Sequence, residues 1–156
     1  MKLLCKYVVL LFLVSAQFSF AQKLTRKEKK ILKTIEANNN EAIEFLKDVV
    51  NINSGTMNHD GVKEVGDVFG KAFEDIGFKS SWYDMSQVNR SGHLFAETSG
   101  NKGKKLLLIG HLDTVFEENS PFQEFKMVND SIAHAPGGND MKGGNVIILY
   151  ALKALK

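Results

Sequence analysis

The stretch KLLLIGHLDTV, residues 105–115, decides the fold class of this 156-residue chain. Its first half, residues 105–109, is an apolar run after one lysine, and a run that is apolar on both faces predicts a strand buried on both faces. Helices must then cover the sheet on either side. The polar residues after Gly110 would leave the sheet at a strand's carboxyl end, where open α/β folds place ligands. The sequence therefore predicts an α/β domain with a mostly buried central sheet flanked by helices.

Helical spacing of apolar residues dominates the chain before this strand. Thr25 and Glu28 have the spacing of a capping box, which predicts that a helix begins there. The three asparagines at residues 38–40 are expected to end that helix and to cap a second one. A third helix is predicted over residues 62–76, because its apolar residues form one stripe and Gly77 is a typical stop.

Short strands and a closing helix are expected in the rest of the chain. The predicted strands are residues 78–83, 93–97, 122–127 and 131–134, the last two forming a hairpin around Asn129 and Asp130. Residues 145–156 carry the apolar spacing of a helix, with Val146, Ile147, Leu149, Tyr150 and Leu152 largely inward. This order of elements fits one layered domain over residues 22–156.

Residues 1–21 have the pattern of a secretory signal peptide. Lys2 and Lys6 form a basic front, residues 7–14 are apolar, and small residues precede an expected cleavage after Ala21. The alternative is a membrane anchor, but the apolar run is shorter than the roughly 20 residues that span a bilayer. The pattern predicts a secreted or periplasmic protein that is free of the membrane after cleavage.

Charge and cysteine content narrow the function further. The whole chain has 20 basic and 18 acidic residues, and losing Lys2 and Lys6 leaves 18 of each, so the mature net charge is zero. A neutral chain gives no preference for nucleic acid or anionic membranes. The single cysteine, Cys5, lies in the signal peptide, so the mature chain has no disulfide and no thiol nucleophile or ligand.

His111 and Asp113 are the first candidates for chemistry. In an extended backbone, residues two apart point to the same side, so the carboxylate would lie beside the imidazole. A carboxylate in that place fixes the tautomer of the ring and raises its basicity, as a metal-binding histidine requires. A polar surface turn would have the same two residues, so this pair alone is a weak signal.

The second candidate is the glycine-rich stretch PGGNDMKGG, residues 136–144, which opens the closing helix and contains Asp140. Four glycines in the eight residues 137–144 indicate unusual backbone geometry or very close packing, although flexibility alone is the alternative. A phosphate-binding loop is disfavoured because the spacing differs from the known fingerprints and Asp140 would repel phosphate.

With these motifs in hand, the chain resembles the family of dizinc metallopeptidases that includes aminoacylase, carboxypeptidase G and succinyl-diaminopimelate desuccinylase. Three stretches carry the resemblance: NSGT at residues 53–56 with Gly61 and Val62, HLDTV at residues 111–115, and residues 137–144. In order and spacing they cover the chain from about residue 40 to its end. The resemblance implies a layered, zinc-exopeptidase-like catalytic domain.

The resemblance also implies roles for three residues. His111 would bind one zinc ion, Asp140 would bridge two, and Asp113 would act in catalysis by orienting His111. The expected cofactor is two Zn²⁺ ions, and Co²⁺ or Mn²⁺ remain open. The family hydrolyses an amide bond next to a free carboxylate, with zinc lowering the pKa of a bound water toward ~7 and a glutamate moving the proton.

Further parts of the family pattern are expected beyond residue 156, namely the general base, the remaining ligands and the lid domain that mediates dimerisation. The chain is thus interpreted as an N-terminal portion that is incomplete at its C-terminus and inactive alone. Three hypotheses stay open: a glutamate carboxypeptidase-like exopeptidase, an N-acyl-amino-acid deacylase, or a non-catalytic truncated binding protein. The expected substrate is a small peptide or N-acyl amino acid, and a longer form would be a homodimer. His134 is expected to pack or face solvent rather than bind metal.

Overall fold

The computed structural model describes residues 23–100 and 103–156. The expected signal peptide, residues 1–21, lies outside the described residues, so its cleavage stays a prediction. None of the helices in the described part has the length and apolarity that crossing a bilayer requires. The chain divides into two compact units, Met1–Lys30 and Ile31–Lys156, and the packing described below belongs to the second.

The first described helix, α2, spans Arg26–Asn51 and begins at the expected capping box. The backbone amide of Thr25 donates to Glu28 Oε2 at 2.6 Å, and the amide of Glu28 donates to Thr25 Oγ1 at 3.2 Å. These reciprocal bonds satisfy amide groups that the first turn leaves without an intrahelical partner. The predicted start of this helix is confirmed.

The predicted break at residues 38–40 is wrong, because α2 runs through all three asparagines. Asn38 Nδ2 donates to the carbonyl of Thr34 at 2.6 Å, so its amide is satisfied within the helix. An asparagine in a helix costs less than about 0.7 kcal/mol relative to alanine. Burial of Val49 and Val50 at the far end of the helix contributes roughly 1.5–3 kcal/mol each, which outweighs that cost.

Helix α3 spans His59–Asp75, three residues longer at its start than expected. Asn58 caps it, since its side-chain oxygen accepts from the amide of Gly61 at 3.0 Å. The helix ends before Gly77, whose φ of 79° agrees with the expected stop.

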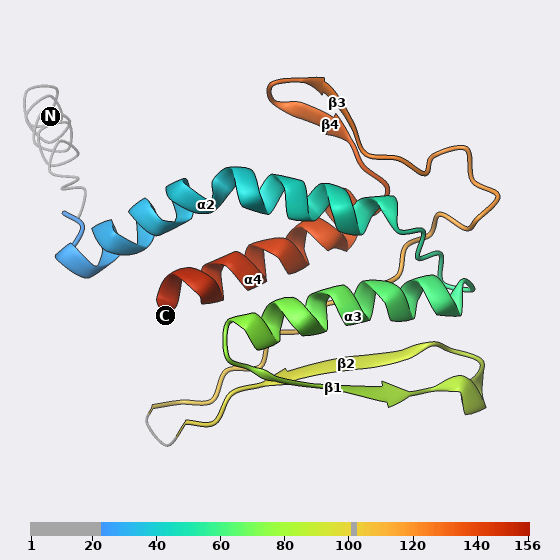
Figure 1. The fold of residues 1–156 in the computed structure, drawn as a ribbon, viewed down its shortest axis with the longest axis horizontal. Helices are drawn as coiled ribbons and strands as arrows, with labels where there is room; N and C mark the ends of the chain where they lie inside the picture. Colours follow the sequence, from blue (N-terminus) through green and yellow to red (C-terminus); the bar gives the residue numbers. More distant parts are fainter. Residues whose placement is uncertain (1–22, 101–102) are drawn as a thin grey trace, which may run out of the picture. The chain divides into compact units, whose positions relative to one another are not determined.

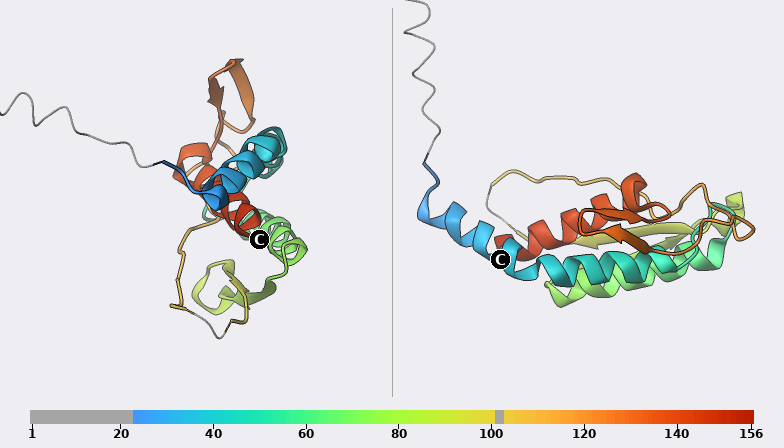
Figure 2. Two further views of the ribbon diagram at one scale, coloured as in Figure 1. Left: turned by 90° about the vertical axis from the view of Figure 1, so that its left-hand side faces the viewer. Right: turned by 90° about the horizontal axis from the view of Figure 1, so that it is seen from above.

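The core lies where α2, α3 and α4 (Gly143–Leu155) meet, and Figures 1 and 2 show these helices side by side. Its fully packed residues are Val49, Val65, Phe69 and Val146. Phe45 of α2 packs edge-on against Phe69 of α3, with ring centroids 5.4 Å apart. The predicted stripes therefore supply the core from α3, α4 and the later part of α2, whereas Leu32, Ile35 and Ile43 of α2, also expected in the core, are exposed. Ile147, expected to point inward, is instead 71% exposed.

Two hairpins complete the described structure. β1 (Lys79–Asp84) pairs antiparallel with β2 (Gly92–Glu97), with Ser81 opposite Phe95, and the short helix η1 (Ser86–Val88) lies between them. β3 (Lys126–Asn129) and β4 (Ile132–His134) form the second hairpin. The two strands of the first hairpin were predicted without their pairing. The second hairpin was predicted as such, although β3 begins four residues later than expected.

The predicted buried strand at residues 105–109 is wrong for the described structure. Leu106, Leu107 and Ile109 are 80%, 79% and 78% exposed. A strand exists only when a neighbour accepts and donates its backbone hydrogen bonds, and no described residue does so for this run. The described residues contain helices and two two-stranded sheets, so the α/β class holds while a single buried central sheet is not present among them.

Candidate metal centre

His111 and Asp140 meet across two loops that are 29 residues apart in sequence. His111 follows the apolar run, and Asp140 lies in η2 (Gly138–Lys142), the irregular turn that leads into α4. His111 Nε2 lies 2.9 Å from Asp140 Oδ1. The structure thus brings the two expected ligands together and facing each other, whereas their role as ligands stays a prediction.

Asp113 lies on the other side of the same imidazole. His111 Nδ1 is 3.0 Å from the backbone carbonyl of Asp113 and 3.2 Å from its carboxylate oxygen Oδ1. Both acceptors favour a proton on Nδ1, and Nε2 is the ring nitrogen that faces Asp140. Both acidic residues predicted for the site are therefore within hydrogen-bonding reach of the His111 ring.

The glycine-rich turn places Asp140 through its backbone. Gly137 has a φ of 69°, a left-handed conformation that residues with a Cβ rarely adopt, and a Cβ there would collide with the methyl group of Thr114. The turn therefore lies directly against the loop that carries His111. Its Asp140–Met141 peptide bond is cis. Unusual backbone geometry and close packing, both expected from the four glycines, are present.

Lys142 ties this turn to α2, a role that the sequence analysis missed. Its side chain is 1% exposed, and Nζ donates to the carbonyls of Val49 at 2.7 Å and Ile52 at 2.8 Å. Burial lowers the pKa of Lys142 to about 8. These carbonyls lie at the C-terminal end of α2, where helical acceptors lack partners. The absence of a basic residue in the last turn of α2 was the available signal.

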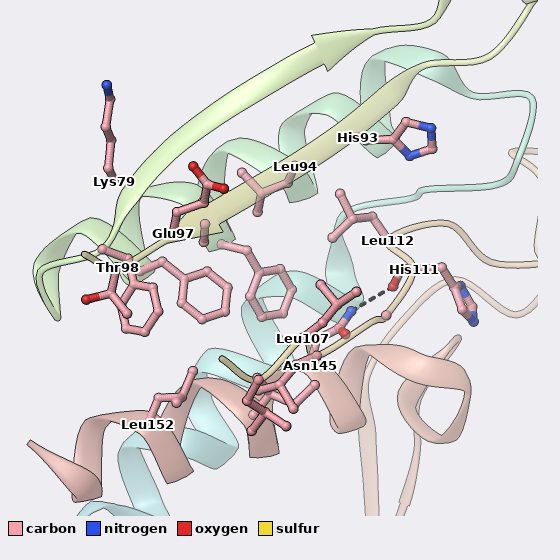
Figure 3. Close-up of a pocket in the computed structure, with 18 of the residues that line it drawn as sticks. Lys79, His93, Leu94, Glu97, Thr98, Leu107, His111, Leu112, Asn145 and Leu152 are labelled. Atoms are coloured by element: carbon pink, nitrogen blue, oxygen red, sulfur yellow. Dashed lines mark hydrogen bonds between the residues drawn. The ribbon is translucent and has the colours of Figure 1, made fainter. Parts of the chain in front are cut away.

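Asn145 holds the backbone of the histidine loop and was also missed. It lies in the first turn of α4, is 8% exposed, and its Nδ2 donates to the carbonyl of His111 at 2.7 Å. Figure 3 shows this bond as a dashed line beside Leu107 and Leu112. The same helix therefore begins with the turn that carries Asp140 and fixes the position of His111.

Opposing effects set the protonation of His111. Partial burial by itself would lower the pKa of the imidazole. The hydrogen bonds to Asp140 and to the Asp113 carbonyl, together with the two negative charges, outweigh that effect and raise the pKa above its ordinary value. A proton on Nε2 competes with a metal ion, because a ligating histidine must be neutral.

A groove of about 1340 Å³ opens beside His111 and Asp113. It lies between β2 and residues 104–112, with α3 and α4 forming the rest of its walls, as the close-up in Figure 3 illustrates. Leu94 and Leu107 line it, and His111 and Asp113 lie along it as well. His111 and Asp113 are therefore reached from a large, partly apolar groove.

The two facing residues fit a divalent metal ion. Two ligands of a tetrahedral zinc ion with bonds of about 2.0–2.1 Å lie roughly 3.4 Å apart, so a small movement from 2.9 Å would admit the ion. Imidazole nitrogen and carboxylate oxygen are both zinc ligands. Within residues 23–100 and 103–156, no group of three or more histidine, cysteine or acidic side chains could hold a metal. His134 lies in β4 with its ring against Phe122, at 6.3 Å between centroids.

Comparison with known proteins gives the class of this chain. Residues 107–156, which contain His111, Asp113 and Asp140, match peptidase family M20/M25/M40. Over this stretch the chain belongs to the peptidase family that its motifs resemble.

The particular similarity is to a carboxypeptidase. The chain is 30% identical over 139 residues to carboxypeptidase G2 from Pseudomonas sp. (strain RS-16), an alignment that covers 86% of this chain. It spans 30% of the length of that relative. The chain is therefore carboxypeptidase G-like in sequence.

Proposed function

We propose that this chain supplies the first part of the dizinc site of a hydrolase that cleaves the amide bond next to a free carboxylate. The single observation that carries the proposal is the 2.9 Å approach of His111 Nε2 to Asp140 Oδ1 from two separate loops. Family membership supports the same reading, since both residues lie within the matched stretch. The similarity to carboxypeptidase G2 favours a glutamate carboxypeptidase-like exopeptidase.

Each residue has one task in this proposal. Nε2 of His111 and the carboxylate of Asp140 would hold the metal, and Asp140 would be the ligand common to both ions. Asp113 accepts the Nδ1 proton, so the ring stays in the tautomer whose Nε2 can bind. When bound, zinc would polarise the substrate carbonyl and lower the pKa of a water molecule. The groove along His111 and Asp113 would take the rest of a small peptide or N-acyl amino acid.

We also propose three further properties: a layered zinc-exopeptidase architecture, export after cleavage at Ala21, and a homodimeric longer form. The exposed apolar run at residues 105–109 supports the first, because its side chains have the composition of a buried strand. The basic and apolar segments of residues 1–21 support the second.

Zinc binding by the chain and two variants tests the proposal. Calorimetric titration should give saturable, weak binding, because one imidazole and one carboxylate supply only part of a coordination shell. His111→Ala and Asp140→Ala should each weaken binding at least about 10-fold. The matched control is Asp130→Ala, an exposed aspartate in the turn between β3 and β4. Equal binding by the wild type and both site variants would contradict the proposal.

Substrate comparison separates the two catalytic hypotheses. With zinc present, the chain alone should leave N-benzoyl-L-glutamate and N-acetyl-L-leucine intact, and measurable turnover would contradict its predicted inactivity. A longer form that carries the general base should release glutamate faster than leucine. The opposite preference would favour the N-acyl-amino-acid deacylase.

A further inference from the structure

The loop at residues 53–56 is bound tightly to the loop that carries His111. The hydroxyl of Ser54, which is 1% exposed, donates to the carbonyl of Leu112 at 3.0 Å. The amide of Thr114 donates to Ser54 at 2.7 Å, and the amide of Thr56 donates to Thr114 at 3.0 Å. These backbone bonds form a parallel bridge that joins segments almost 60 residues apart in sequence. The backbone on both sides of Asp113 is thereby fixed.

Within this bridge, the side chain of Thr56 contacts the carboxylate of Asp113. Its hydroxyl lies 2.6 Å from Asp113 Oδ2 and 3.3 Å from the Thr114 carbonyl, and its single proton goes to the closer acceptor. The other carboxylate oxygen, Oδ1, lies 3.2 Å from His111 Nδ1. One oxygen of Asp113 is thus occupied by Thr56 while the other faces the ring.

Close packing of the two loops holds Thr56 near Asp113. A Cβ at the neighbouring Gly55 would come within 2.7 Å of the backbone of Glu117, so only glycine lets the two loops approach this closely. Threonine is also branched at Cβ, which restricts its χ1 angle and keeps the hydroxyl in place. The hydroxyl is therefore presented to Asp113 by a rigid backbone and a restricted side chain.

We infer that Thr56 is a positioning residue of the metal centre. Its hydroxyl holds the carboxylate of Asp113 beside the ring. There the charge of Oδ1, 3.2 Å from Nδ1, adds to the hydrogen bond that the Asp113 carbonyl accepts at 3.0 Å, so the proton stays on Nδ1 and Nε2 is left for the ion. The chain of contacts is Thr56 to Asp113, Asp113 to His111, and His111 to Asp140. This inference rests on the proposed function for the last contact only, because the first two need no metal ion.

Imidazole ¹⁵N NMR on the 156-residue chain tests the inference without activity. The His111 signals are assigned by their loss in His111→Ala. At a pH where the ring is neutral, Asp113 and Asp140 compete for its single proton, and the wild type should show a measurable population of the Nδ1–H tautomer. Thr56→Val, which replaces the hydroxyl with a methyl group, should lower that population, and Thr56→Ser should restore the wild-type spectrum. Thr98→Val, at an exposed threonine, is the matched control.

Zinc titration of the same samples separates this inference from the proposed function. Thr56→Val should weaken zinc binding about 10-fold, as loss of a contact behind a metal ligand does, and Thr56→Ser should recover it. Unchanged tautomer and affinity in Thr56→Val would overturn the positioning role, while zinc binding by the wild type would leave the proposed function standing. A changed tautomer in a chain that binds no zinc would overturn the proposed function alone.

A double-variant cycle tests the positioning role of Thr56 even if Thr56→Val lowers the stability of the fold. Circular dichroism first establishes that each variant is folded. In an Asp113→Asn background, removing the Thr56 hydroxyl should change zinc affinity no further, because contacts that act through one another are not additive. Full additivity of the two substitutions would mean that Thr56 acts by another route, which contradicts the inference.

Discussion

The two halves of residues 105–115 differ sharply although they are consecutive. Residues 105–109 are apolar and lie open to solvent, with Leu107 79% exposed. Residues 111–114 are polar for the most part and are held by bonds to Ser54, Thr56 and Asn145. The apolar half has no hydrogen-bonded backbone partner among the described residues, and the polar half has several.

This difference indicates where the order of the candidate site comes from. The site does not depend on a sheet around residues 105–109, since no described strand pairs with them. It depends on two local attachments, the bridge from residues 53–56 to Thr114 and the buried contact from Lys142 to the end of α2. Both ligand loops are therefore anchored to the helical core rather than to the open apolar run.

Breaking the Lys142 attachment should have the largest effect on stability. Lys142→Met keeps most of the volume but leaves the buried carbonyl of Val49 and the partly buried carbonyl of Ile52 without this donor. Each unsatisfied buried group costs about 1–3 kcal/mol, so the free energy of unfolding should fall by roughly 2–4 kcal/mol. Urea denaturation followed by circular dichroism measures this change.

The matched control for that variant is Lys126→Met, at an exposed position in β3. It should leave the free energy of unfolding within about 0.5 kcal/mol of the wild type, as surface changes usually do. Equal stabilities for the two variants would mean that the Lys142 contact does not anchor the turn.

Changing the exposed apolar half, residues 105–109, should have the smallest effect on the free energy of unfolding. Leu107→Ser removes an apolar side chain that is 79% exposed and should alter the free energy of unfolding by less than about 0.5 kcal/mol. The same denaturation experiment applies. A loss above about 1.5 kcal/mol, the lower end for a fully buried leucine, would show that residues 105–109 are buried in solution, which would contradict the contrast drawn above.

Local signals in the sequence were enough for most of the helices and hairpins. The capping box at Thr25 and Glu28, the stripe that includes Val65 and Phe69, and the stop at Gly77 all act within a few residues. The helix break predicted at the asparagines of residues 38–40 was wrong, because their low helix propensity is a weak effect and packing further along the helix outweighs it. The strand at residues 105–109 failed because a strand needs a partner, and an apolar run cannot specify whether one is present.

The candidate site, like the fold, could be predicted only from signals that lie within a short stretch of sequence. His111, Asp113 and Asp140 stand out because their residue types and loop contexts suggest metal chemistry. Thr56, Lys142 and Asn145 could not be found in that way, since each acts through a contact that spans 34 to 93 residues of sequence. Only the folded chain brings such partners together.

Diffraction at the zinc absorption edge, from crystals of the chain soaked in zinc, would locate the ion itself. We expect an anomalous peak within about 2.0–2.2 Å of both Nε2 of His111 and a carboxylate oxygen of Asp140. A zinc peak on other residues, or a well-ordered His111–Asp140 contact that excludes the ion, would contradict it.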